Sequence, residues 1–115
     1  MRSILSEDKI STAARVKIDG FHAEIVDEVK SAIAAHEIVL VGMAGNPFVK
    51  RARKLLDEKT LPYKYLEYGS YLSKWQERLA IKLWSGWSSY PQVFIAGKLI
   101  GGYSDLVQHL NAKKN

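Results

Sequence analysis

The sequence predicts an α/β fold in which helices flank a buried sheet, and three observations carry the prediction. Residues 38–41, Ile-Val-Leu-Val, form a short and continuously apolar run, which is typical of a strand covered on both faces of a sheet. Residues 21–36 and 47–59, on either side of that run, place apolar side chains at helical spacing. Residues 92–100 contain two apolar runs around the tight turn Ala96-Gly97, which indicates a hairpin of strands.

The first half of the chain supplies an arm, two helices and a strand. Residues 1–20 are mixed and polar, and we predict an N-terminal arm there, ahead of a domain that spans 21–115. The helix over 21–36 has apolar residues three and four positions apart on one face. The helix over 47–59 has a marked start, because asparagine is a favoured N-cap and proline suits the first helical position. Its predicted buried stripe is Phe48, Ala52, Leu55 and Leu56.

The second half alternates in the same way. Residues 62–68 are rich in strand formers. Residues 71–84 predict an amphipathic helix, and Gly101-Gly102 ends the second strand of the hairpin. Ser104 is a suitable N-cap for a final helix over 105–112. The predicted inward face of the helix over 71–84 is Leu72, Trp75, Leu79 and Leu83.

Composition excludes several kinds of chemistry. The chain has 115 residues and no cysteine, so it has no disulfide, no thiolate nucleophile and no thiolate metal ligand. Its three histidines show no metal-ligand spacing, and we predict no metal site. No apolar run approaches the ~18 residues of a membrane span, and we expect no membrane partner and a cytoplasmic location. The net charge of +5 owes much to residues 50–54, a cluster more typical of a solvated helix face than of a nucleic-acid site.

Two segments resemble the glutaredoxin family. Residues 89–98 read SYPQVFIAGK and residues 100–106 read IGGYSDL, where the family has segments such as TVPQVFINGK, with a cis-proline, and GGCDDL. Residues 78–92 look closest to the monothiol branch. The resemblance implies a thioredoxin-like fold, with a mixed four-stranded sheet flanked by helices and an added N-terminal helix or arm.

The resemblance also shows what is missing. Asn46 falls where the family has its nucleophilic cysteine, and Val49 falls where a second cysteine or a serine follows. An asparagine amide neither ionises nor carries a sulfur, so it cannot take part in thiol–disulfide exchange. The ligand for an iron–sulfur cluster shared between monothiol members is lost with the same cysteine. We therefore expect a redox-inactive protein with no catalytic residue and no required cofactor.

A binding groove for glutathione, or for another extended peptide, is the second implication of the resemblance. Family members pair the ligand with the backbone of the residue before the cis-proline, here Tyr90 before Pro91. An arginine at the position of Arg78 meets a ligand carboxylate. The γ-glutamyl end lies at the start of the last helix, at Gly102, Tyr103 and Ser104. Two departures weaken the match, because Ser104 replaces an aspartate and Met43 replaces a lysine.

Other interpretations stay open at this point. The chain could be a protein-interaction or regulatory module whose groove Tyr103 closes, with Trp84, Trp87 and residues 50–54 contacting an unidentified protein partner. It could bind nucleic acid through the same basic helix. It could hold a glutathione thiolate with Ser88, Ser89 or Tyr90 and act by a non-thiol mechanism. Each site residue also has a purely structural interpretation, Asn46 as a helix cap and Arg78 as an arginine on a solvated helix face.

Overall fold

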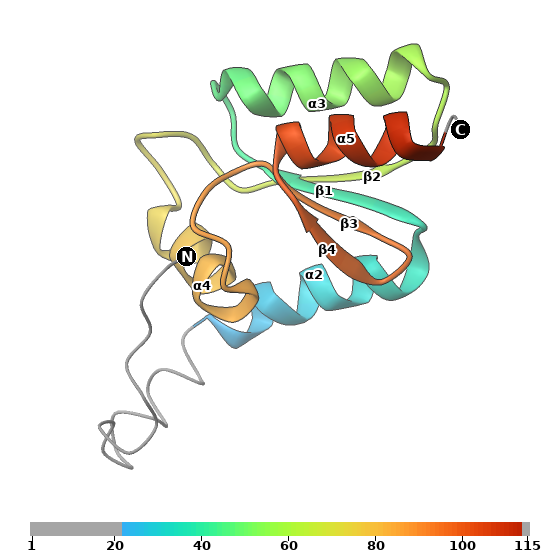
Figure 1. Ribbon diagram of the computed structural model, residues 1–115. Coiled ribbons are helices and arrows are strands. Elements are labelled where there is room, and N and C mark those ends of the chain that lie inside the picture. Colours follow the sequence, from blue (N-terminus) through green and yellow to red (C-terminus); the bar gives the residue numbers. More distant parts are fainter. Residues whose placement is uncertain (1–21, 114–115) are drawn as a thin grey trace.

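The structure is a computed structural model that describes residues 22–113 (Figure 1). The predicted arm, residues 1–20, lies outside the described residues. The observed elements follow the predicted order, with ends that differ by a few residues. They are α2 (Ala23–Ala35), β1 (Ile38–Gly42), α3 (Pro47–Glu58), β2 (Lys64–Glu67), α4 (Trp75–Ser85), β3 (Gln92–Ile95), β4 (Lys98–Gly101) and α5 (Tyr103–Lys113).

The four strands form one mixed sheet in the order β2-β1-β3-β4. Strand β1 runs parallel to β2 and antiparallel to β3, and the hairpin partner β4 forms the other edge. Helices α2 and α4 cover one face of the sheet, while α3 and α5 cover the other (Figure 1). This is the thioredoxin-like arrangement, and the predicted fold class is confirmed.

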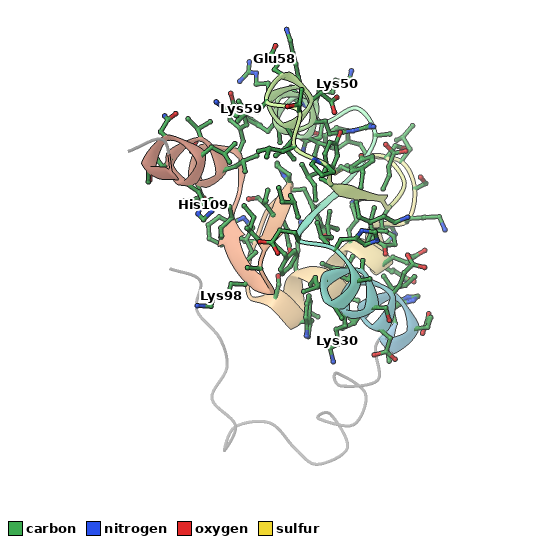
Figure 2. All side chains as sticks on the ribbon, turned by 90° about the vertical axis from the view of Figure 1, so that its right-hand side faces the viewer. Lys30, Lys50, Glu58, Lys59, Lys98 and His109 are labelled. Atoms are coloured by element: carbon green, nitrogen blue, oxygen red, sulfur yellow. The ribbon has the colours of Figure 1, made fainter. Side chains whose placement is uncertain are left out.

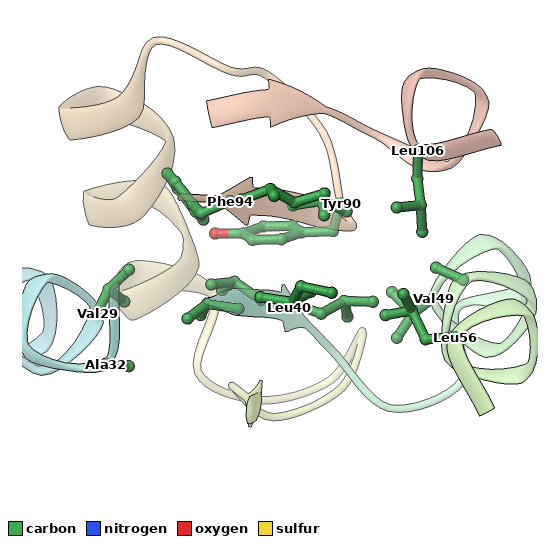
Figure 3. Packing of buried hydrophobic residues seen from close by; sticks show 14 of the residues in the cluster. Val29, Ala32, Leu40, Val49, Leu56, Tyr90, Phe94 and Leu106 are labelled. Carbon is green, nitrogen blue, oxygen red and sulfur yellow. The ribbon is translucent and has the colours of Figure 1, made fainter. Parts of the chain in front are cut away.

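The core lies on both faces of the central strands. All five residues of β1 are buried, as expected for a strand covered on both faces. In Figure 3, Leu40 of β1 lies between Val29 of α2 on one side and Leu56 of α3 on the other. The two helical layers therefore pack on opposite faces of the central strands β1 and β3, both of which are fully buried.

The predicted buried stripe of α3 was wrong in one position. Phe48 is 48% exposed, and the buried residues of the helix are Val49, Ala52 and Leu56. The reason is a close approach of helix and strand: a Cβ atom added to Gly42 would lie 2.7 Å from Cγ1 of Val49. Because Gly42 has no side chain, Val49 fills this space, and Phe48 is turned about 100° around the helix axis toward solvent.

The predicted inward face of the helix over 71–84 was wrong throughout. Helix α4 begins at Trp75, and its buried residues are Arg78, Ala80 and Ile81. The four apolar residues expected inside are exposed: Leu72 by 97%, Trp75 by 60%, Leu79 by 37% and Leu83 by 46%. The helix is rotated so that Arg78 reaches backbone acceptors in the interior, which turns the apolar stripe outward.

The start of the last helix also differs from the prediction. Helix α5 begins at Tyr103, two residues earlier than expected, and Gly102 stands at the capping position in place of Ser104. The Leu106 amide donates to the Gly102 carbonyl over 3.0 Å, which closes the first turn. The Gly102 amide donates to Asp105 Oδ2 over 2.9 Å. Asp105 thus reaches back to the capping residue from the third helical position, as in a capping box.

Candidate ligand-binding site

The turn before α3 is closed by its own asparagine. Asn46 Oδ1 accepts hydrogen bonds from the amides of Phe48 and Val49, over 2.9 and 3.1 Å. These two amides are among those a helix leaves without an intrahelical partner, and they lie at the positive end of its dipole. The predicted role of Asn46 as a helix cap is confirmed. The two amides that would stabilise a thiolate therefore already donate to a neutral acceptor, the side-chain oxygen of Asn46.

The loop before β3 brings Tyr90 and Pro91 to the start of α5. The Tyr90–Pro91 peptide bond is cis. A Cβ atom added to Gly102 would lie 3.5 Å from the Pro91 carbonyl oxygen, so the first turn of α5 adjoins the loop. Tyr90 precedes Gln92, the first β3 residue paired with β1, so its backbone lies outside that pairing. An extended ligand has backbone groups to pair with along this loop.

The Tyr90 side chain lies in the interior of the protein. Its ring is buried, and its hydroxyl donates to the Arg78 carbonyl oxygen over 2.6 Å. Burial raises the pKa of Tyr90 well above its ordinary value. The residue therefore contributes its backbone to the candidate site, while its neutral phenol ties the loop to α4. It is not placed to hold a thiolate with its hydroxyl.

Arg78 lies inside the protein. Only 7% of the residue is exposed, and its Nη1 donates to the carbonyl oxygens of Tyr68, over 3.0 Å, and Ser73. The interpretation of Arg78 as an arginine on a solvated helix face was therefore wrong. These bonds hold the segment between β2 and α4 in place. A ligand carboxylate would meet a guanidinium that already has two internal acceptors.

The first turn of α5 offers the clearest groups for an anionic ligand. The amides of Tyr103 and Ser104 belong to a first turn, which has no intrahelical acceptors for them. Ser104 is an exposed residue at this turn. Tyr103 is half-buried, packs against the core and lines a cavity of about 300 Å³ together with residues of α3. The Gly102 amide is taken by Asp105.

Gln92 and Asp105 lie near the loop and were not among the predicted site residues, whereas Trp87 was predicted only as a contact for a protein partner. Gln92 is fully buried, and its Nε2 donates to the Trp87 carbonyl oxygen over 3.0 Å. Trp87 Nε1 and Gln92 Oε1 are buried and have no partner among the described residues. Trp87 Nε1 lies 3.8 Å from the Cβ position of Gly102. Only Asp105 carried a signal, because its spacing of three from Gly102 matches a capping box.

Residues 22–113 contain neither a metal-binding cluster nor a membrane-spanning helix. This part of the chain holds no group of three or more histidine, cysteine, aspartate or glutamate residues able to bind a metal ion. The same residues form no helix with the length and apolar character needed to cross a membrane.

Comparisons with known proteins place these features in context. Residues 38–100 match the family model described as Glutaredoxin. A "Glutaredoxin-like protein" of Dictyostelium discoideum is 47% identical over 94 residues, covering 82% of this chain and 76% of the relative. "Glutaredoxin 1" of Rickettsia prowazekii (strain Madrid E) is 34% identical over 71 residues, or 62% of this chain and 74% of that one.

Solved structures give the same picture. The fold is similar to that of wheat glutaredoxin, with a TM-score of 0.68 at 25% identity over 81% of this chain and 86% of that chain. It is also similar to a buckwheat glutaredoxin–glutathione complex, with a TM-score of 0.68 at 21% identity over 80% of this chain and 84% of that chain.

Proposed function

Because the chain belongs to the glutaredoxin family, we propose that it is a redox-inactive member that binds glutathione, or an extended peptide of similar chemistry, along the Tyr90–Pro91 loop. The observation that carries the proposal is the contact between this loop and the first turn of α5. The backbone of the loop and a set of helix N-terminal amides lie close together there. We propose no cofactor and no catalytic step.

The loss of redox chemistry follows from the residues. Thiol–disulfide exchange needs a thiolate as the attacking group, and the sequence contains no cysteine. Asn46 fills the position of the nucleophile, and its side-chain oxygen caps α3. Backbone pairing and anion binding at a helix N-terminus need no sulfur from the protein. Ligand binding at this loop therefore does not depend on an active-site cysteine.

Support for glutathione as the ligand comes from chemistry and from a protein of similar fold. The peptide carries two carboxylates, one of which suits the amides of Tyr103 and Ser104 at the positive end of α5. Its central backbone suits pairing with Tyr90, as in the addition of a strand to an open edge. The buckwheat glutaredoxin was crystallised as a complex with glutathione. Membership of the monothiol branch and a cytoplasmic location stay our expectations from sequence.

One set of observations favours a second candidate, a protein-interaction module with a closed groove. Asn46 Oδ1 occupies the first-turn amides of α3, Arg78 is bonded to interior carbonyl oxygens, and Asp105 occupies the Gly102 amide. Several polar groups near the proposed ligand are therefore satisfied within the chain. In this candidate, glutathione gains little from groups that are already bonded, and its affinity is low.

A titration followed by NMR separates the two candidates. Labelled protein is titrated with S-methylglutathione, which cannot form a disulfide, up to about 10 mM, a range that detects even millimolar affinity. Shifts confined to the amides of Tyr90, Tyr103 and Ser104 support the proposal. The absence of shifts there contradicts it and favours the closed module.

A gain-of-affinity variant sharpens this test. Ser104→Asp restores the carboxylate that the family resemblance places against the ligand ammonium, and Ser104→Asn is its uncharged match. We expect Ser104→Asp to bind about tenfold more tightly than Ser104→Asn, as one charge-assisted hydrogen bond contributes roughly 1.5 kcal/mol or more. Equal affinities for the two variants would place the ligand elsewhere.

A further inference from the structure

Helix α4 has an apolar face on each side. Its inner side packs Ile81 and Ala80 into the protein, whereas its outer side carries Trp75, Leu79 and Leu83, which are 60%, 37% and 46% exposed. Leu72, just ahead of the helix, is 97% exposed and extends the series. Solvent-facing helix surfaces are normally polar, and contiguous exposed apolar patches of this kind mark interaction sites. We call Leu72, Trp75, Leu79 and Leu83 the α4 outer stripe.

The spacing of the stripe suits a second copy of the same chain. Trp75 and Leu83 each lie four residues, about 6 Å along the axis, from Leu79. These three helical residues are therefore arranged symmetrically about Leu79, while Leu72 lies ahead of the helix and outside the symmetric set. If two α4 helices pack antiparallel around a twofold axis at Leu79, each Leu79 meets its copy and each Trp75 meets Leu83 of the other chain. A twofold interface requires this kind of self-complementary surface.

Helix geometry supports the same arrangement. Residues 75, 79 and 83 form a ridge at four-residue spacing. Packing such ridges of two helices into one another gives a crossing angle of about −50°, the commonest class of helix contact. Both helices can then bury their ridges without a change in backbone.

A contact through this surface meets less charge repulsion than one through α3. The chain carries a net charge of +5, which opposes self-association in general. Beside the stripe, however, Lys74 is paired with Glu77 over 3.7 Å. The basic residues of α3, such as Lys50, lie on the other face of the sheet from α2 and α4 (Figures 1 and 2). Two copies can thus approach through α4 while keeping their basic helices apart.

The exposed apolar area of the stripe limits how strongly two copies could associate. The stripe exposes on the order of 400 Å² of apolar side chain per copy, compared with about 800 Å² per partner in a standard interface. Polar residues at the rim would supply the rest of the area. A contact of this size would therefore be weak and reversible, and would form only at high protein concentration.

We propose that the α4 outer stripe is a self-association surface through which two copies form a weak twofold-symmetric dimer with Leu79 at the axis. The proposal is independent of glutathione binding. Sedimentation equilibrium of the full chain between about 10 µM and 1 mM tests it, a range that covers weak association. We expect the average mass to rise from that of a monomer toward twice that value. A mass that stays at the monomer value throughout overturns the proposal and points to a different cover for the stripe, either residues 1–21 or another protein.

Charge variants at the axis provide the decisive experiment. Leu79→Glu and Leu79→Lys each place like charges against one another, so each variant alone should lose the mass increase. Mixed in equal amounts, the two should regain it, because only the mixed pair brings opposite charges together at the axis. Circular dichroism of each variant checks that the fold is kept. Phe48→Glu adds the same charge to an exposed apolar position on α3, and it should leave dimerisation unchanged.

Several results of these experiments would contradict the proposed dimer. If Leu79→Glu dimerises like the unmodified chain, or if Phe48→Glu abolishes the mass increase equally, the interface is not at the stripe. If the single variants are monomeric and their mixture is also monomeric, the axis does not pass through Leu79. Should Leu79→Glu fail to fold, Leu83→Glu mixed with Leu83→Lys keeps the proposal testable: Leu83 faces Trp75 of the other copy and not itself, so each variant alone should weaken association and the mixture should restore nothing.

Discussion

The capped turn before α3 should activate a thiol if one is put back. In Asn46→Cys, the introduced sulfur lies one bond nearer the backbone than Oδ1, the atom that accepts from the amides of Phe48 and Val49. The same amides would then face a group that can ionise. Because both hydrogen bonds and the helix dipole favour the anion, the pKa of the introduced thiol should fall below its ordinary value of about 8.5.

The magnitude follows from the two donors. A hydrogen bond to a charged group contributes about 1.5–3 kcal/mol, against about 1 kcal/mol for a neutral acceptor. Two donors therefore favour the thiolate over the thiol by roughly 2–3 kcal/mol, after allowance for a site that is only half-buried. One pKa unit equals 1.36 kcal/mol, so we expect a fall of about two units, to a pKa near 6.5.

The assay is the rate of alkylation by iodoacetamide as a function of pH, whose midpoint reports the thiol pKa. Ser88→Cys is the control, because residue 88 is exposed and lies in a loop outside any helix. Its midpoint should stay near 8.5. If both variants titrate at the same pH, the amides of Phe48 and Val49 do not stabilise an anion, and our account of the turn is wrong. The unmodified chain, which has no thiol, gives the background rate.

Two further predictions concern stability. Arg78→Met should lower the free energy of unfolding by about 2–3 kcal/mol, because the carbonyl oxygens of Tyr68 and Ser73 lose a buried donor; urea denaturation measures this, and a loss below about 0.5 kcal/mol would mean that water replaces the guanidinium. Tyr68 donates its hydroxyl to Glu28, and burial, followed by this hydrogen bond, raises its pKa above the ordinary value near 10. Its stabilising effect is therefore complete below about pH 10 and is lost as the pH rises further. Above about pH 10, the melting temperature should fall more steeply with pH for the unmodified chain than for Tyr68→Phe. Equal slopes for the two proteins would mean that folding does not raise the pKa of Tyr68.

Local patterns in the sequence predicted the elements and the cap of α3, but not the cap of α5, where Gly102 stands in place of Ser104. The strand at Ile38–Gly42 was predicted because an unbroken apolar run has few alternatives to a place inside a sheet. The start of α3 was predicted because Asn46 and Pro47 act on the amides of the next turn, within a few residues of chain. The loss of the redox reaction needs no structure at all, since it follows from the absence of cysteine.

The direction in which a helix face points was decided only by the tertiary structure. The spacing of Trp75, Leu79 and Leu83 identifies a stripe on α4, but periodicity is the same whether a stripe faces the core or the solvent. Arg78 settled the matter, because its partners are carbonyl oxygens five and ten residues earlier, which come within reach only after β2 and the following loop are in place. Composition and spacing thus determined which segments form helices and strands and which chemistry is excluded. The rotation of α4, the engagement of Arg78 and the exposed stripe depend on contacts between segments, which no local pattern encodes.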